Sequence, residues 1–282
     1  MSTPLVTYAQ NREDMYLWAL LGHRKKGFYV DVGAHHPEFH SVTKLFYDRG
    51  WRGINIEPNP ELHKTFARTR RRDINLNLGV ADKKGLLRFR NYPHHNGLST
   101  FSEEIMKIHE GQDLPYEDSE VEVKPLSDLL AKQDIPPIDF MKVDVEGFEV
   151  EALNGNDWDK YRPSVLAVEA TVRQKINPML KKLGYKLEFF DGLNNYYLDT
   201  VEPESLTIYN YAPRVLGTGN YTSRELQLQK KIDELETQLA GKSQAYDQLE
   251  TEYHKIRRRQ VRTIAAAGKR RARGYASKIV KG

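Results

Sequence analysis

The sequence predicts an α/β protein in which helices cover both faces of a mostly parallel sheet and an antiparallel hairpin closes that sheet. Strand and helix patterns alternate from about residue 28 to about residue 199, which is typical of βαβ connections between parallel strands. The last two strand patterns, 185–190 and 195–198, are separated by a short turn, as the strands of a hairpin are. From residue 223 the pattern changes to that of a long helix with a basic end.

The elements follow from the spacing of apolar residues and from turn residues. A buried strand is expected at 28–32, because aromatic residues and valines fill that segment between two glycines. A helix is expected at 60–70, because proline is favoured at the first helical position. Residues 120–124 alternate with a period of two, as a half-exposed edge strand does. The other expected strands are 53–57, 73–80, 86–91, 138–144 and 164–170, and the other expected helices are 41–49, 126–133, 148–153 and one that ends at residue 183.

Three segments are expected along the chain: an α/β domain at 1–215, a coiled-coil helix at 223–260 and a basic tail at 261–282. In the second segment, apolar residues recur at the spacing of a coiled-coil seam, which Lys242 interrupts. This favours self-association, and an amphipathic helix that packs on the α/β domain is the alternative. The seam residues are Leu228, Ile232, Leu235, Leu239, Tyr246, Leu249, Tyr253 and Ile256.

The net charge of +4 hides an asymmetry between the tail and the rest of the chain. Residues 253–282 hold 11 of the 43 Lys and Arg and none of the 39 Asp and Glu, so residues 1–252 carry a net charge of −7. Short apolar segments between the basic clusters favour contact with an anionic membrane surface. Nucleic acid is disfavoured, since Tyr275 alone offers little base stacking. A solvated tail is the alternative.

Several classes of protein are excluded or disfavoured. Cysteine is absent, which excludes disulfides and thiolate catalysis. No apolar run is long enough to span a bilayer, and the first residues lack the pattern of a signal peptide. We therefore expect a cytoplasmic protein, with its tail at the inner face of the membrane.

A candidate nucleotide site follows the first buried strand. Asp31 lies near the carboxyl end of this strand, and Gly33 lets the backbone turn tightly towards a ligand. Glu57 ends the next strand, where a carboxylate can accept hydrogen bonds from ribose hydroxyls. Only Gly33 remains of a G-x-G-x-x-G motif, which argues against NAD and FAD and for an adenosine ligand without phosphates. A βαβ unit that binds nothing is the alternative.

Six motifs resemble those of FkbM-family methyltransferases, in the same order. They are Asp31-Val-Gly-Ala, Ile56-Glu-Pro-Asn-Pro, Asn77-Leu-Gly-Val-Ala, Gly97-Leu-Ser-Thr, Val123-Lys-Pro-Leu and Met141-Lys-Val-Asp-Val-Glu-Gly, and the resemblance covers roughly residues 8 to 199. It implies a Rossmann-like class I methyltransferase fold, S-adenosylmethionine as cofactor and methyl transfer to an oxygen, commonly a sugar hydroxyl of a glycan. The chain departs from the family's commoner first motif, D-V-G-A-N-x-G, at His35 and Pro37, which predicts a different shape for that loop.

The resemblance also implies roles for individual residues. Asp31 and the backbone around Gly33 would hold the amino-acid end of the cofactor, Glu57 would bind the ribose, and Gly79 and Ser99 would border the adenine. The other candidate cofactor residues are Ser41 and Asp144. A sugar hydroxyl is a poor nucleophile, so a base or a metal ion is expected. The candidate catalytic residues are Asp144, Glu146, His36 and Glu169. Asp144 and Glu169 could together chelate a hard cation such as Mg²⁺. For Glu146, a carboxylate that favours a helix start is the structural alternative.

Two other functions stay open. A cofactor-binding scaffold without activity is disfavoured, because it would not need Asp31, Glu57 and Asp144. A nucleic-acid methyltransferase guided by the basic tail is disfavoured by the acidic body and by the lack of an N/D-P-P-Y motif. The expected partners are therefore a glycan or sugar acceptor and further copies of this chain.

Overall fold

The computed structural model describes residues 5–201, 221–222 and 231. The expected coiled coil and basic tail lie outside the described residues, apart from Lys231. The predicted segment boundaries and the predicted self-association therefore stay predictions. Within the part of the chain that the structure describes, no helix is both long and apolar enough to cross a membrane.

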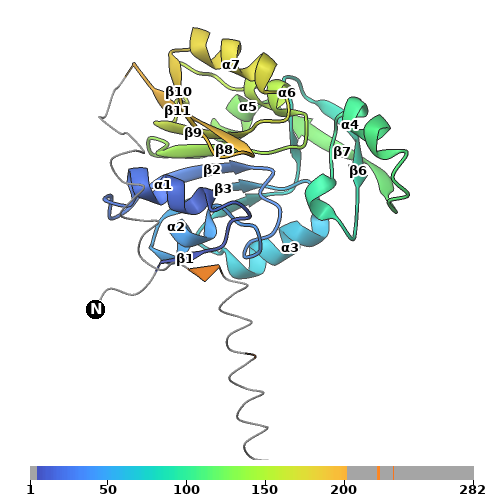
Figure 1. Ribbon diagram of the computed structural model, residues 1–282, viewed down its shortest axis with the longest axis horizontal. Helices are drawn as coiled ribbons and strands as arrows, with labels where there is room; N and C mark the ends of the chain where they lie inside the picture. Colours follow the sequence, from blue (N-terminus) through green and yellow to red (C-terminus); the bar gives the residue numbers. More distant parts are fainter. Residues whose placement is uncertain (1–4, 202–220, 223–230, 232–282) are drawn as a thin grey trace, which may run out of the picture. The chain divides into compact units, whose positions relative to one another are not determined.

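The centre of the fold is a seven-stranded sheet with the strand order β10-β11-β9-β8-β2-β3-β4 (Figure 1). Neighbouring strands from β4 to β9 run parallel, whereas β11 runs antiparallel to both β9 and β10. The strands are β2 (Phe28–Val32), β3 (Arg52–Ile56), β4 (Ile74–Leu76), β8 (Phe140–Val143), β9 (Val165–Glu169), β10 (Tyr185–Phe190) and β11 (Asn194–Asp199). The predicted α/β class, with a mostly parallel sheet and a closing antiparallel hairpin, is confirmed.

The strand order reverses between β2 and β8, and this reversal positions the site. From β2 the chain continues outward to β3 and β4, and it later returns to β8 on the other side of β2. The register pairs Val32 with both Ile56 and Val143, so β2, β3 and β8 end at the same edge of the sheet. Ligands of open α/β sheets bind in the crevice at such an edge.

Helices cover both faces of this sheet (Figure 1). Val30 and Val32 belong to the core cluster that includes residues of α5 (Leu126–Leu130), α6 (Glu149–Asn154) and α7 (Arg173–Lys182). Tyr29, which directly precedes Val30, belongs to the cluster that includes residues of α1 (Glu13–Leu21) and α2 (Lys44–Asp48). This division follows from the alternation of side chains along a strand.

Helix α3 (Pro60–Thr69) begins as the sequence predicts. The side chain of Asn59 accepts hydrogen bonds from the backbone N–H groups of Glu61 and Leu62, and Pro60 occupies the first turn. Helix α2 begins at Lys44, later than the predicted start at residue 41. A short parallel pair, β1 (Val6–Thr7) with β12 (Tyr221–Thr222), lies outside the main sheet.

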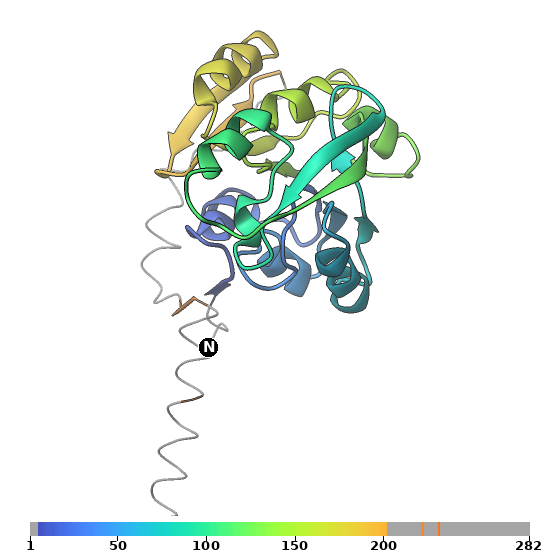
Figure 2. The same ribbon diagram turned by 90° about the vertical axis from the view of Figure 1, so that its right-hand side faces the viewer.

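A second, three-stranded sheet stands beside the first. It has the order β5-β7-β6, and Figure 2 shows β6 and β7 as an antiparallel pair in front of the main sheet. Its strands are β5 (Gly79–Val80), β6 (Gly85–Asn91) and β7 (Glu117–Lys124), and between β6 and β7 lie the 3₁₀ helix η1 (Asn96–Leu98) and α4 (Glu103–His109). Ala81, Phe89, Phe101 and Val123 form its own core.

The expectation of one strand at 73–80 is wrong. This segment is divided into β4, in the main sheet, and β5, in the second sheet. The side chain of Asn77 lies at the division and donates hydrogen bonds to the carbonyl oxygens of Glu57 and Pro58, both at 2.9 Å. These contacts hold the chain in a turn between the two sheets.

Candidate active site

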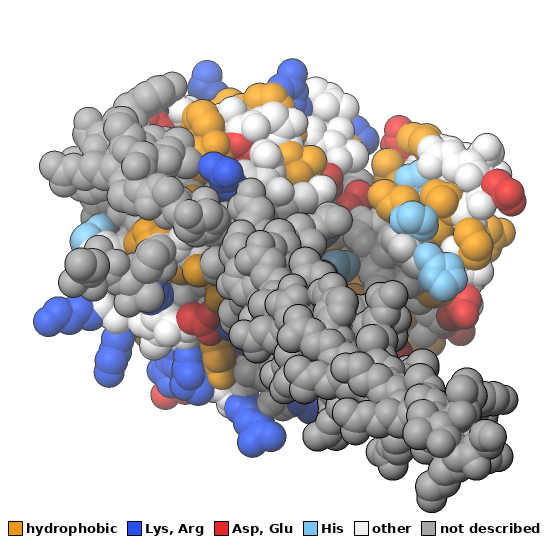
Figure 3. All heavy atoms as spheres, turned by 60° about the horizontal axis from the view of Figure 1, so that its bottom comes forward, with side chains coloured by type: hydrophobic (Ala, Val, Ile, Leu, Met, Phe, Trp, Pro, Cys, Tyr) orange, Lys and Arg blue, Asp and Glu red, His pale blue; other side chains and the backbone are white. Residues whose placement is uncertain are grey.

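A cavity of about 530 Å³ lies at the carboxyl ends of β2, β3 and β8. Val32, Gly33 and Glu57 contribute to its wall from the main sheet. Gly79 and Phe89 contribute from the second sheet, together with the loop 94–99. The space-filling view in Figure 3 shows histidine and apolar side chains gathered on one side of the molecule and Lys and Arg side chains on another.

Gly33 occupies a position at which any other residue would be strained. Its φ angle is +76°, and a Cβ atom added there would lie 1.8 Å from the backbone oxygen of Asp144. Its N–H donates a hydrogen bond to the carbonyl oxygen of Ile56 at 3.0 Å. The backbone therefore turns tightly against β8 and lies directly on the cavity wall.

Glu57 lines the cavity and is held by two backbone groups. Its Oε2 accepts a hydrogen bond from the N–H of His35 at 2.7 Å, and its Oε1 accepts one from the N–H of Asn59 at 2.8 Å. Burial raises the pKa of Glu57 to about 7, although these two hydrogen bonds oppose the shift. Each carboxylate oxygen has two lone pairs, so one on each oxygen remains for a hydroxyl donor.

The loop after β2 brings His35 and His40 to the cavity wall. Both residues have a φ angle of 55°, and their rings stack with centroids 6.3 Å apart. Burial lowers the pKa of His35 to about 4, so this ring is neutral. His36 is not among the residues that line the cavity. Its Nδ1 accepts hydrogen bonds from the N–H groups of Glu38 and Phe39, both at 3.1 Å, so the structure does not bring His36 to the other candidate catalytic residues.

Asp31 lies behind the cavity wall and reaches it through Lys142. The Asp31 carboxylate is buried, and its Oδ1 lies 4.0 Å from Nζ of Lys142. The same Nζ lies 3.0 Å from Oδ2 of Asp144, which lines the cavity. Burial alone would lower the pKa of Lys142, but the carboxylates of Asp144 and Asp31 outweigh it and raise that pKa. Ser41 is also buried and does not line the cavity, so contact of Asp31 or Ser41 with a cofactor stays a prediction.

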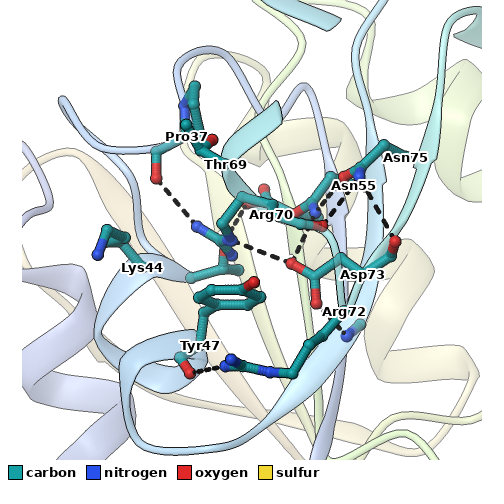
Figure 4. A network of polar contacts seen from close by, with 12 residues as sticks. Pro37, Lys44, Tyr47, Asn55, Thr69, Arg70, Arg72, Asp73 and Asn75 are labelled. Carbon is teal, nitrogen blue, oxygen red and sulfur yellow. Dashed lines mark hydrogen bonds and ion pairs between the residues drawn. The ribbon is translucent and has the colours of Figure 1, made fainter. Parts of the chain in front are cut away.

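The guanidinium of Arg70 anchors the loop after β2, which carries His35 and His40 (Figure 4). Arg70 is fully buried and donates to the carbonyl oxygen of Pro37 at 3.0 Å, which fixes the middle of the loop. It also donates to Asp73 at 3.0 Å and to the hydroxyl of Tyr29 at 2.8 Å. A last hydrogen bond, at 2.9 Å, joins Arg70 to the hydroxyl of Thr43.

This buried network continues to the cavity. The Thr43 hydroxyl donates to Oδ2 of Asp31 at 3.0 Å, and Asp31 in turn faces Lys142. Arg70 is not predicted from the sequence, because it begins a run of three arginines, a pattern typical of a solvated surface.

Three of the candidate catalytic residues meet at the ends of β8 and β9. Asp144, Glu146 and Glu169 each offer a carboxylate oxygen, and these oxygens all lie within 4.8 Å of one another. Burial, and next the charge of Asp144, raise the pKa of both Glu146 and Glu169. Oε2 of Glu169 has no hydrogen-bond partner among the described residues.

Glu149, the first residue of α6, is a fourth carboxylate near this group. Its Oε1 accepts hydrogen bonds from the N–H groups of Val145, at 3.1 Å, and Gly147, at 3.0 Å. Its Oε2 is buried and has no partner in the described part of the chain. Burial raises its pKa to about 7. The sequence offered one signal for Glu149, an acidic residue at a helix start, but that pattern has a sufficient structural explanation.

Gly79 and Ser99, the expected borders of the adenine, both lie on the cavity wall. A Cβ atom on Gly79 would lie 2.6 Å from the ring of Phe101. The hydroxyl of Ser99 accepts a hydrogen bond from the N–H of Tyr92 at 3.1 Å and donates one to Asn91 at 3.2 Å. Their contact with adenine stays a prediction.

In a comparison with protein families, residues 31–187 match the methyltransferase FkbM domain. No curated protein matches the chain in sequence. Among solved structures, precorrin-6y C5,15-methyltransferase from Geobacter metallireducens GS-15 is 12% identical, with a TM-score of 0.39, over 71% of this chain and 93% of that one. The METTL16 methyltransferase domain is 12% identical, with a TM-score of 0.38, over 66% of this chain and 65% of that one. The C-terminal domain of precorrin-6Y C5,15-methyltransferase from Rhodobacter capsulatus is 12% identical, with a TM-score of 0.34, over 66% and 85%.

Proposed function

The chain belongs to the FkbM methyltransferase family, and from this premise we propose that it transfers the methyl group of S-adenosylmethionine to a sugar hydroxyl of a glycan or glycoconjugate. The family and the fold imply the use of S-adenosylmethionine. One observation carries the proposal: a single cavity is lined by Glu57 on one side and by Asp144 and Glu146 on another.

The residues of the cavity fit the cofactor. Glu57 has free lone pairs for both ribose hydroxyls, and Gly33 presents bare backbone on the cavity wall. Gly79 and Ser99 would border the adenine. The bound cofactor would supply a methyl group that is already activated by its sulfonium. The chain's own task is then to place an acceptor oxygen and to accept its proton.

The carboxylate group favours an uncharged polyol as the acceptor. Carboxylates accept hydrogen bonds from hydroxyls, and a sugar presents several hydroxyls close together. A polyanion such as nucleic acid would instead bring further negative charge beside Asp144, which lines the cavity. Asp144 lines the cavity and is oriented by the ammonium group of Lys142, which makes it our candidate for the residue that positions the acceptor hydroxyl and takes its proton.

The experiment combines labelled S-adenosylmethionine with a panel of neutral and acidic glycans and with RNA and DNA, followed by mapping of the methylated atom. Transfer to a sugar oxygen supports the proposal, and it should be lost in Asp144→Asn while S-adenosylhomocysteine still binds. The exposed Asp82 provides a matched control, since Asp82→Asn should retain activity. Methyl transfer to a nitrogen or to nucleic acid would overturn the proposal.

Self-association through residues 223–260 and contact of the 261–282 tail with the inner face of an anionic membrane are part of this proposal. They rest on the sequence pattern alone. Sedimentation of the full chain and of a chain ending at residue 222, with and without vesicles that contain phosphatidylserine, tests both. If the two chains have the same oligomeric state and bind the vesicles equally, both proposals are contradicted.

A further inference from the structure

The carboxylates at the ends of β8 and β9 have the spacing of ligands around one ion. Hard cations such as Mg²⁺ and Ca²⁺ bind oxygen at about 2.0–2.6 Å, so two ligands on opposite sides of the ion lie roughly 4–5 Å apart. The carboxylate oxygens of Asp144, Glu146 and Glu169 all lie within 4.8 Å of one another, which meets this limit.

Unsatisfied oxygens give a second and separate indication. Glu169 is 8% exposed, and its Oε2 has no hydrogen-bond partner in the described segments. Glu149 is fully buried, and its Oε2 also has none there, although its Oε1 accepts two backbone hydrogen bonds. Buried carboxylate oxygens are ordinarily bonded, so each of these requires an explanation. A cation between Asp144, Glu146 and Glu169 would satisfy the oxygen of Glu169, whereas Glu149 is not one of the three residues whose carboxylate oxygens meet.

The backbone at this point is strained and fixed from outside. Glu146 has a φ angle of 52°, and Gly147, which follows it, has a φ angle of +88°. The hydroxyl of Thr100 donates to the carbonyl oxygen of Glu146 at 2.7 Å and holds this turn in place. Strained residues that their surroundings hold firmly are concentrated at ligand sites.

The site carries an excess of negative charge that a cation would reduce. Asp144, Glu146 and Glu169 carry three negative charges when ionised, and the single positive charge of Lys142 lies 3.0 Å from Asp144 and 4.0 Å from Asp31. A divalent cation would offset two of these negative charges.

We propose that Asp144, Glu146 and Glu169 bind one hard divalent cation of the Mg²⁺ type, with Glu149 as a buried carboxylate beside them. Three protein ligands leave positions for water or for an acceptor hydroxyl, as is usual for Mg²⁺. This step rests on the proposed function: the ion would bind the sugar hydroxyl, lower its pKa and orient it towards the methyl group, and the hydroxyl proton would pass to the carboxylate of Asp144 as the oxygen–methyl bond forms.

The test uses Mn²⁺ as a probe on the full chain without cofactor, with free Mn²⁺ measured by electron paramagnetic resonance. We expect one bound ion per chain, and at least a tenfold loss of affinity in Glu169→Gln and in Asp144→Asn. Glu120, exposed on β7, gives the control Glu120→Gln, which should bind as the unchanged chain does. Melting temperatures of all variants show whether each one is folded.

No Mn²⁺ binding at millimolar concentration, or equal binding in folded Glu169→Gln and Asp144→Asn, would overturn the cation site. Binding of S-adenosylhomocysteine and methyl transfer are measured with and without EDTA in parallel. Transfer that continues in EDTA would overturn the role of the ion and leave the proposed function intact. Site-specific Mn²⁺ binding without transfer to any sugar would support the site and count against the function instead.

Discussion

Glu57→Gln is the sharpest test of the cofactor site, because it replaces one carboxylate oxygen by an NH₂ group and keeps the size of the side chain. In the unchanged chain the two carboxylate oxygens accept from the N–H groups of His35 and Asn59. The glutamine side chain keeps one acceptor, so one of these N–H groups would face an NH₂ group. A buried donor without a partner costs about 1–3 kcal/mol, and the free energy of unfolding should fall by about that amount.

The effect on binding follows from the ribose hydroxyls. Losing one hydrogen bond to a charged acceptor costs about 1.5–3 kcal/mol of binding free energy. A loss of ~1.4 kcal/mol raises Kd tenfold. We expect Glu57→Gln to weaken S-adenosylhomocysteine roughly 10- to 100-fold by isothermal titration calorimetry at pH 8, where the carboxylate is ionised. Between pH 6 and pH 8 the unchanged chain should bind more tightly as the pH rises, because burial raises the pKa of Glu57 to about 7.

The matched control is Glu61→Gln in α3. Glu61 is exposed and pairs with Lys64, so its amide should leave Kd within twofold of the unchanged value. A folded Glu57→Gln protein whose Kd also stays within twofold, and whose affinity varies with pH as before, would refute the assignment of Glu57 to the ribose.

Three further predictions concern stability, measured by urea unfolding. Gly33→Ala should lower the free energy of unfolding by more than about 1 kcal/mol, since φ is +76° there. The control is Gly85→Ala, where an added Cβ atom would lie in open space. Equal losses of stability in the two variants would contradict the predicted backbone strain at Gly33. Arg70→Met should cost about 3–5 kcal/mol, because it leaves a buried carboxylate unpaired, whereas the exposed Arg71→Met should stay within about 0.5 kcal/mol. Burial raises the pKa of Asp14 from 3.8 to about 7, so its contribution to stability is complete below pH 3.8 and is lost as the pH rises through 7. The free energy of unfolding should therefore decline towards pH 8, and less steeply in Asp14→Asn, by at most about 1.4 kcal/mol per pH unit; equal slopes would contradict this.

The main sheet and its functional edge were predictable from the sequence. Short apolar segments bounded by turn residues determine where the strands end, and parallel strands end at a common edge. For this reason the positions of Glu57 and Asp144 on the cavity, and the proximity of Glu146 and Glu169, agree with the sequence analysis. The family assignment also agrees.

What the sequence did not reveal depends on contacts between distant residues. The division of 73–80 between two sheets depends on hydrogen bonds from Asn77 to carbonyl oxygens about 20 residues earlier in the chain. The burial of Arg70 depends on Tyr29 and Pro37, which no local pattern connects to it. Asp31 lies near the carboxyl end of a strand as predicted, but only the folded arrangement shows that Lys142 stands between it and the cavity side chain of Asp144.

The cavity is built from two sheets with separate cores, and this gives the protein a modular construction. The edge of the main sheet carries Glu57 and Gly33, whereas residues 79–124 pack around Phe89, Phe101 and Val123 as a unit. A chimaera that takes 79–124 from another family member should retain Glu57 and the carboxylates of Asp144, Glu146 and Glu169, while the wall around the expected adenine position changes. The second sheet can thus vary without loss of the side chains that the main sheet contributes to the cavity.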